Sequence, residues 1–219
     1  MNKTLNAVIF DMDGVITNTM PYHYRVWKKI FHDEGISVSK FQVYKREGQK
    51  GIESLREIFA LHHKPFCDKY GQALLAKKEK ILKNIVKTRF VPGACLFLKK
   101  MKKNGFRLAL VTGTSRHEVE QILPKDIYHL FDVVICGSDV KKGKPHPEPY
   151  LKAIKALKIK RGEAFVVENA PLGIASAKKA GLRCLALKTS LPAKYLKEAD
   201  AVFNGFASLE RYVHGQYCF

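Results

Sequence analysis

Six short apolar runs recur along the chain, and longer stretches with a helical pattern separate them. Each run has three to five residues, rich in Val, Ile, Leu and Phe. Such runs are typical of strands that are buried on both faces, and their alternation with helices predicts a doubly wound, mainly parallel sheet of the α/β class. The expected strands are residues 7–10, 108–112, 133–136, 164–167, 184–187 and 201–203.

The alternation stops between about residues 20 and 90, where no strand-like run occurs. Amphipathic helical patterns cover residues 22–31, 51–61 and 66–86, with Pro21 at the start of the first. Pro92 and Gly93 then mark the return to the main pattern, and Gly105 and Gly181 stand where two of its helices should end. The pattern predicts a main domain of residues 1–16 and 90–219, with an inserted helical domain of residues 17–89.

Length and composition indicate a globular protein. The chain has 219 residues, of which 46% are hydrophobic, and no apolar run is long enough to cross a bilayer. Asp11 interrupts the N-terminal apolar run, which argues against a signal peptide, so we expect a cytoplasmic protein without a membrane partner. The five cysteines are widely spaced and odd in number, which favours reduced, mostly buried thiols over disulfides or zinc: Cys67, Cys95, Cys136, Cys184 and Cys218.

The formal charge of +19 raises three classes of partner, namely nucleic acid, anionic membrane and anionic substrates. Many lysines, including Lys99, Lys100, Lys102 and Lys103, fall at solvent-facing helical positions without interleaved aromatic residues. This pattern favours a solvated basic surface. A basic nucleic-acid-binding protein with a vestigial site remains the rival interpretation, which salt-dependent retention on DNA without phosphatase activity would support.

Two carboxylates, Asp11 and Asp13, follow directly on the first expected strand, and Gly14 allows a tight turn after them. The carboxyl ends of parallel strands face the ligand crevice of an open α/β sheet. Two acids at this spacing suit a divalent cation, and one can attack a substrate while the other transfers protons. A turn that is merely rich in Asp and Gly is the alternative.

Three later segments also carry polar residues at or soon after a strand end. Thr112 and Gly113 precede a helix and can hold a phosphate, although Ser115 and Glu118 have the spacing of an ordinary capping box. Lys144 lies on a proline-rich loop, where it can neutralise a phosphoryl group. Glu168 and Asn169 offer oxygen ligands for magnesium, although Asn169 also suits a helix N-cap.

The ordered set Asp-x-Asp, Thr, Lys and Glu-Asn resembles the four motifs of the haloacid dehalogenase superfamily across the whole main domain. Four segments resemble its β-phosphoglucomutase-like subgroup: residues 11–17 (DMDGVIT), residues 22–27 (YHYRVW), Lys144-Pro145-x-Pro147, and the Gly, Ile and Ala pattern of residues 173–181. The resemblance implies a Rossmann-like core and makes the inserted domain a helical cap that excludes water and selects the substrate.

The resemblance also implies a role for each motif residue. Asp11 would attack phosphorus to form an aspartyl-phosphate, and Asp13 would protonate the leaving oxygen and then activate water. Thr112, Gly113 and Lys144 would bind the phosphoryl group. Mg²⁺ would be the cofactor, and its implied ligands are the Asp11 carboxylate, the Asp13 carbonyl, Glu168 and Asn169. A dehalogenase is disfavoured, because dehalogenation does not use the proton transfer by Asp13.

Some positions depart from the resemblance. The family commonly has aspartate at the position of Asn169, which should weaken metal binding, and the mutases have aspartate at the position of Asn18. Their specificity loop aligns so that Glu47 replaces a lysine and Gly51 replaces a phosphate-binding arginine.

A mutase must hold a bisphosphorylated intermediate, which needs a second anion site. Arg46 and Lys50 could compensate for the lost arginine, and His23 matches a mutase histidine. We therefore expect a phosphatase that acts on a small phosphorylated metabolite such as a sugar phosphate, as a monomer or weak dimer. A β-phosphoglucomutase-type mutase is the alternative.

Overall fold

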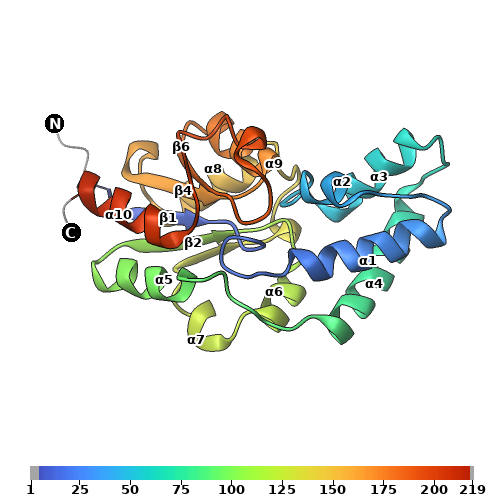
Figure 1. The fold of residues 1–219 in the computed structure, drawn as a ribbon, viewed down its shortest axis with the longest axis horizontal. Helices are drawn as coiled ribbons and strands as arrows, with labels where there is room; N and C mark the ends of the chain where they lie inside the picture. Colours follow the sequence, from blue (N-terminus) through green and yellow to red (C-terminus); the bar gives the residue numbers. More distant parts are fainter. Residues whose placement is uncertain (1–4, 218–219) are drawn as a thin grey trace.

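The computed structural model describes residues 5–217 and has a six-stranded sheet with helices on both faces (Figure 1). The strand order is β3-β2-β1-β4-β5-β6, and every neighbouring pair is parallel. The predicted α/β class is thereby confirmed, and each observed strand lies within one residue of its expected ends. The strands are β1 (Ala7–Phe10), β2 (Arg107–Val111), β3 (Val133–Ile135), β4 (Ala164–Glu168), β5 (Arg183–Leu187) and β6 (Ala201–Phe203).

Successive side chains of β1 point to opposite faces of the sheet, so this strand contributes to two apolar layers. Val8 and Phe10 pack in one layer and Ala7 and Ile9 in the other, all fully buried. The first layer is covered by α5 (Ala94–Lys103), α6 (Arg116–Ile122), α7 (Lys125–Tyr128) and α10 (Phe206–Tyr217). The second is covered by α8 (Glu148–Leu157) and α9 (Pro171–Lys179).

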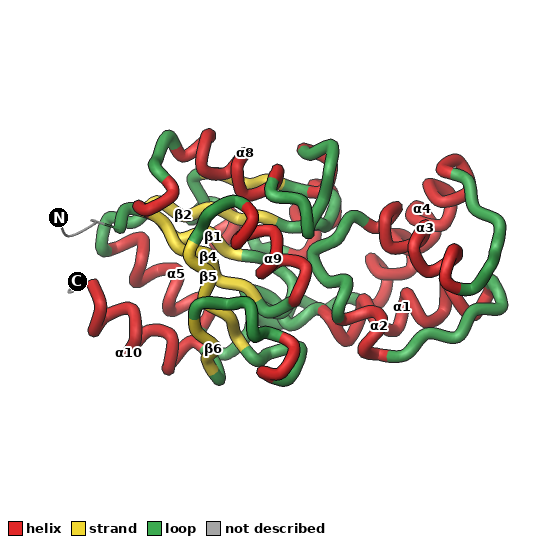
Figure 2. The backbone as a smooth tube through the Cα atoms, turned by 90° about the horizontal axis from the view of Figure 1, so that it is seen from above, coloured by secondary structure: helices red, strands yellow, loops and turns green. Residues whose placement is uncertain are grey.

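Four helices lie together beyond the carboxyl ends of the strands, to the right of the sheet in Figure 2, and pack around an apolar cluster of their own. They are α1 (Met20–Asp33), α2 (Lys40–Tyr44), α3 (Gly51–Leu61) and α4 (Asp68–Ile85). Three of them match the expected helical patterns. The sequence analysis missed α2, which is too short to show a period, although Ser39 and Gln42 form a complete capping box at its start.

The chain leaves and re-enters the sheet domain at adjacent points. Thr17 forms an isolated antiparallel bridge with Phe90, so the entering and leaving segments run side by side. This arrangement lets about seventy residues be inserted without disturbing the sheet. Gly105 and Gly181 follow α5 and α9 with φ values of 82° and 74°, as expected of helix ends.

Within residues 5–217, no helix is both long and apolar enough to cross a bilayer. The four cysteines in this range are free thiols. Cys136 and Cys184 are buried, as expected, but Cys95 is half-buried and Cys67 is exposed, so the expectation of mostly buried thiols was too broad. Cys218 lies outside the described residues.

Candidate active site

The carboxyl ends of β1, β2 and β4 bring the predicted polar residues to one edge of the sheet. Asp11 follows β1, Thr112 follows β2 and Glu168 is the last residue of β4. The strand order reverses direction between β1 and β4, and ligands of open α/β sheets bind in the crevice at such a point.

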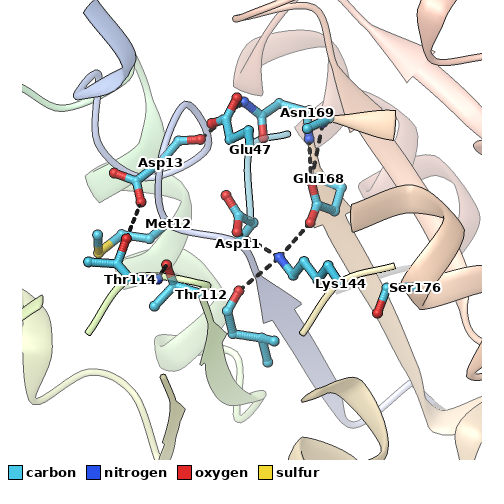
Figure 3. A network of polar contacts seen from close by, with 12 residues as sticks. Asp11, Met12, Asp13, Glu47, Thr112, Thr114, Lys144, Glu168, Asn169 and Ser176 are labelled. Carbon is cyan, nitrogen blue, oxygen red and sulfur yellow. Dashed lines mark hydrogen bonds and ion pairs between the residues drawn. The ribbon is translucent and has the colours of Figure 1, made fainter. Parts of the chain in front are cut away.

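Lys144 joins two of these strand ends through its side chain (Figure 3). Its Nζ lies 2.7 Å from Asp11 Oδ1, 2.7 Å from Glu168 Oε1 and 3.1 Å from the Val111 carbonyl oxygen. The three side chains are buried. Burial raises the pKa of Asp11, although the Lys144 ammonium acts in the opposite direction. Burial also opposes the charge on Lys144, but the two carboxylates outweigh it and raise the pKa of this lysine.

Contacts from two sides hold the Lys144 loop in place. The Ser176 hydroxyl donates to the His146 carbonyl at 2.6 Å, and the Gly143 amide donates to Glu53 Oε1 of α3 at 3.3 Å. The Tyr150 hydroxyl donates to Glu168 Oε1 at 2.8 Å, on the same oxygen that Lys144 contacts. The loop therefore contacts both the sheet domain and the inserted helices.

Asp13 accepts bonds from several short side chains. Thr114 Oγ1 lies 2.9 Å from Asp13 Oδ2, and the Thr19 hydroxyl donates to Asp13 Oδ1. His23 Nε2 is 3.2 Å from the same Oδ1. Burial works against the charge on Asp13, but His23 and the hydroxyl donors outweigh it and lower the pKa to about 2. Asp13 is therefore a carboxylate in the protein without substrate.

Thr112 and Gly113 lie beneath the inserted domain. Thr112 Oγ1 accepts the Thr114 amide at 3.1 Å. A β-carbon at Gly113 would lie 2.4 Å from the Gly48 carbonyl oxygen and 2.7 Å from that of Gln49, so only glycine fits. Glycine is needed at position 113 because the backbone of residues 48 and 49 comes so close to it.

The expected capping box at α6 is only half formed. Ser115 Oγ accepts the Glu118 amide at 3.3 Å, but the Glu118 carboxylate does not return to the Ser115 amide. Its Oε1 instead pairs with Lys78 of α4 at 2.7 Å, and both side chains are buried. Glu118 Oε2 still accepts from the Ser115 hydroxyl at 3.4 Å, so the contact with the inserted domain is made in addition to the local one.

Asn169 is not a helix cap, because α9 begins after Ala170 and has no side-chain cap. Its Nδ2 faces three oxygen atoms, at 3.1 Å from the Asp13 carbonyl, 2.8 Å from Glu47 Oε1 and 2.7 Å from Ser190 Oγ. Figure 3 shows Glu47 and Asn169 side by side above Asp11. Burial and the nearby carboxylate of Asp11 raise the pKa of Glu47 well above its ordinary value.

Three buried oxygens around this point have no hydrogen-bond donor within the described part of the chain: Asp11 Oδ2, Asn169 Oδ1 and Glu47 Oε2. Unpaired buried acceptors are costly, and carboxylate and amide oxygens are the ligands that Mg²⁺ prefers. Residues 5–217 hold no cluster of three or more His, Cys, Asp or Glu side chains with metal-binding geometry. The donor set implied by the motifs includes a backbone carbonyl and an amide, so it is not such a cluster, and its chemistry fits a hard cation.

The inserted domain is seated on the sheet domain, and a half-open cavity of about 480 Å³ lies between the two. Asp13 and Gly113 line this cavity from the sheet side, and His23, Arg46 and Lys50 line it from the helical side. Five of the expected site residues lie outside its lining: Asp11, Thr112, Lys144, Glu168 and Asn169. The segment of residues 47–49 covers two of them, because Gly48 packs directly on Lys144 and Glu47 contacts Asn169.

The two basic residues expected to form a second anion site have protein partners. Arg46 Nε pairs with Glu57 Oε2 at 3.0 Å, and its Nη1 donates to the Gln42 carbonyl at 2.9 Å. Lys50 Nζ donates to the Val140 carbonyl at 2.9 Å. The structure therefore brings His23 to Asp13 but uses Arg46 and Lys50 in structural contacts.

Sequence reasoning missed Thr19, Thr114 and Glu47 at this site. Thr114 could have been found because it lies two residues after Thr112, where a hydroxyl group can face the carboxylates. Glu47 was noted only as a replacement for a lysine. No local pattern indicates that Thr19, six residues after Asp13, donates to it.

Comparison with known proteins places the site in a family. The model for "Haloacid dehalogenase-like hydrolase" matches residues 8–187. A phosphorylated carbohydrates phosphatase from Thermotoga maritima is 31% identical, over 90% of this chain and 93% of its own length. Validoxylamine A 7'-phosphate phosphatase from Streptomyces hygroscopicus subsp. limoneus is 29% identical, over 90% and 92%. The solved structure of a β-phosphoglucomutase-like protein from Bacteroides vulgatus superposes with a TM-score of 0.89 at 30% identity, over 99% of this chain and 92% of the other. The chain therefore belongs to the haloacid dehalogenase-like hydrolases.

Proposed function

We propose that this protein is a magnesium-dependent phosphatase of small phosphorylated metabolites such as sugar phosphates, which works through an aspartyl-phosphate on Asp11. The observation that carries the proposal is the environment of Asp11. Its Oδ1 is held by Lys144 at 2.7 Å, whereas its Oδ2 is buried without a hydrogen-bond donor from residues 5–217. Lys144 thus fixes the carboxylate, which keeps an oxygen free of protein donors for the phosphoryl group and the cation. The relatives named as phosphatases of phosphorylated carbohydrates and of validoxylamine A 7'-phosphate support the substrate class.

The first step forms a bond between a carboxylate oxygen of Asp11 and phosphorus and breaks the bond from phosphorus to the leaving oxygen, which takes a proton from Asp13. In the second step Asp13 takes a proton from water as that water attacks the phosphorus, which releases Asp11 and inorganic phosphate. The low pKa of Asp13 keeps it in the unprotonated form that the base step requires. The acid step requires a proton on Asp13, and the negative phosphoryl group favours it because like charges raise the pKa of a carboxyl group.

The other expected residues hold the transferred group and the cation. Thr112, the Gly113 amide and Lys144 would contact the phosphoryl oxygens, and Asp11, the Asp13 carbonyl, Glu168 and Asn169 would hold Mg²⁺. When bound, the cation spreads the negative charge that builds on the phosphoryl oxygens. His23 lies 3.2 Å from Asp13 and would orient it.

We propose that residues 17–89 are a cap that opens to admit substrate and closes for transfer. Residues 47–49 cover Lys144 and Gly113, so a phosphoryl group reaches Asp11 only after this segment moves. A cavity of about 480 Å³ has room for a small sugar phosphate. The core would then be residues 1–16 and 90–219.

Hydrolysis is favoured over a mutase reaction because neither Arg46 nor Lys50 is free to bind a second phosphate group. The Arg46 guanidinium is engaged by Glu57 and Lys50 is bound to the Val140 carbonyl, so neither is positioned to grip a second phosphate. The assay supplies β-glucose 1-phosphate with Mg²⁺ and a trace of the bisphosphate, and measures free phosphate against glucose 6-phosphate. We expect phosphate to dominate, whereas rapid isomerisation with little phosphate release would establish the mutase. A panel of phosphorylated metabolites then identifies the preferred substrate.

A further inference from the structure

Glu47 is an acidic residue of the helical domain that lies inside the catalytic site of the sheet domain. Only 5% of its surface is exposed, and its Oε1 lies 2.8 Å from Asn169 Nδ2. The same oxygen comes within 2.8 Å of a β-carbon placed at Gly14, so the carboxylate also packs against the turn that follows Asp13. Among residues 5–217, the side-chain hydrogen bond to Glu47 therefore comes from a neutral amide.

The ammonium of the site is already engaged by other oxygens in the part of the chain that the structure describes. Lys144 is the buried ammonium of the site, and its three donors are directed to Asp11, Glu168 and the Val111 carbonyl. An isolated charge at this depth would be strongly unfavourable without a positive partner.

The surroundings of Glu47 contain more acceptors than donors. The amide nitrogen of Asn169 has two hydrogens but faces three oxygen atoms. Beyond these, Asp11 Oδ2, Asn169 Oδ1 and Glu47 Oε2 have no donor in the described chain. Such a surplus of buried oxygens, drawn from three separate segments, is the environment that a divalent cation satisfies and that further hydrogen bonds from the protein cannot.

We propose that Glu47 is a magnesium-binding residue contributed by the cap, which supplies the negative charge that the neutral amide of Asn169 does not. This inference rests on the magnesium site of the proposed function and adds a ligand to it. The cation would then be held jointly by Asp11 and Asn169 of the core and by Glu47 of the cap.

A shared cation couples metal binding to cap closure. Glu47 precedes Gly48 and Gln49, the residues that cover Gly113, so the segment that delivers the carboxylate is also the one that closes the site. A ligand that contacts Glu47 only in the closed arrangement favours that arrangement, and closure raises the affinity for the ligand by the same factor.

The direct test measures Mg²⁺ affinity by calorimetry, without substrate, for wild type, Glu47→Gln and Asn169→Asp. Glutamine keeps the shape and can still accept from Asn169, so the fold should be retained, as circular dichroism would show. We expect Glu47→Gln to bind Mg²⁺ at least tenfold more weakly and Asn169→Asp to bind it more tightly than wild type. Combining the two substitutions should recover most of the affinity lost in Glu47→Gln.

The matched control is Glu79→Gln, which removes the same charge from another cap glutamate that lines the cavity. Its Mg²⁺ affinity should stay within twofold of wild type. Hydrogen exchange provides a second readout, since Mg²⁺ should slow exchange of the amides of residues 47–51 in wild type but not in Glu47→Gln.

The outcomes separate this inference from the function on which it rests. If wild type binds Mg²⁺ and Glu47→Gln binds it equally well, Glu47 is not a ligand, while the magnesium-dependent phosphatase stands. If wild type binds no Mg²⁺, the metal dependence of the proposed function is wrong and the role of Glu47 is wrong with it. Equal loss of affinity in Glu79→Gln would also overturn the inference, because a general charge effect would then explain both variants.

Discussion

Lys78 of α4 and Glu118 of α6 form a buried ion pair between the helical domain and the sheet domain, with 2.7 Å between Nζ and Oε1. The only tryptophan of the chain, Trp27, lies beside it, with Lys78 Nζ 5.8 Å from the ring centre. Both members of the pair line the cavity. The pair is therefore a buried contact between the sheet domain and the proposed cap, and the fluorescence of Trp27 can report on it.

We expect Lys78→Met and Glu118→Gln to open the cap, because leaving one buried charge unpaired in the closed arrangement costs about 3–5 kcal/mol. Quenching of Trp27 fluorescence by acrylamide should increase in both variants, and KM should rise more than kcat falls. The control is Lys77→Met, since Lys77 pairs with Asp33 on the surface at 2.8 Å. Unchanged quenching in both buried variants would show that the pair does not hold the cap.

Asp11→Asn should abolish turnover, because an amide cannot attack phosphorus although it matches the carboxylate in shape. We expect kcat to fall at least about 10³-fold, as measured with the best substrate from the panel. Near-wild-type activity would exclude Asp11 as the nucleophile.

The same substitution should change the pH dependence of stability. Folding raises the pKa of the Asp11 carboxyl group from 3.8 to about 8. The folded protein therefore becomes less stable as pH rises from 3.8 to about 8, because the charged carboxylate is disfavoured in the folded state. In EDTA, the Tm of Asp11→Asn relative to wild type should therefore rise between pH 4 and pH 8, by roughly 5 °C for about 2 kcal/mol. A constant difference across this range would mean that burial does not disfavour the Asp11 carboxylate.

Asp13→Asn should separate the two chemical steps, because only one of them can proceed without a proton donor. An aryl phosphate with a good leaving group needs no protonation, so it should still phosphorylate Asp11, while hydrolysis is slowed about 10²–10⁴-fold without the base. Intact-mass spectrometry should detect phosphorylated protein with this substrate and not with an alkyl phosphate. Full activity of the variant on an alkyl phosphate would exclude the role.

Lys144→Met should destabilise the fold as well as remove activity. The ammonium contacts both Asp11 and Glu168, which would then be buried without a cationic partner from the described chain. We expect a loss of about 3–5 kcal/mol in the free energy of unfolding, measured in urea with EDTA present. Mg²⁺ should recover part of this loss because it supplies a positive charge at the same carboxylates, and a loss below 1 kcal/mol would contradict the proposed electrostatic role.

The amino-acid sequence was sufficient to predict the sheet, its strand ends and the residues gathered there. The apolar runs are local patterns, and parallel strands point their carboxyl ends to one edge, so Asp11, Thr112 and Glu168 could be expected together. A short helix such as α2 escaped prediction because five residues show no period.

The tertiary structure alone decided what the helical domain contributes to the site. Arg46 and Lys50 looked available in the sequence, but their partners, Glu57 and the Val140 carbonyl, are brought to them by the packing of α3 and by the docking of the helical domain on the sheet domain. Glu47 lies 122 residues from Asn169 in the chain, and no periodicity links them. Sequence patterns report local conformation, whereas contacts between two domains depend on how their surfaces fit, and that fit placed a cap carboxylate among the oxygens of the proposed magnesium site.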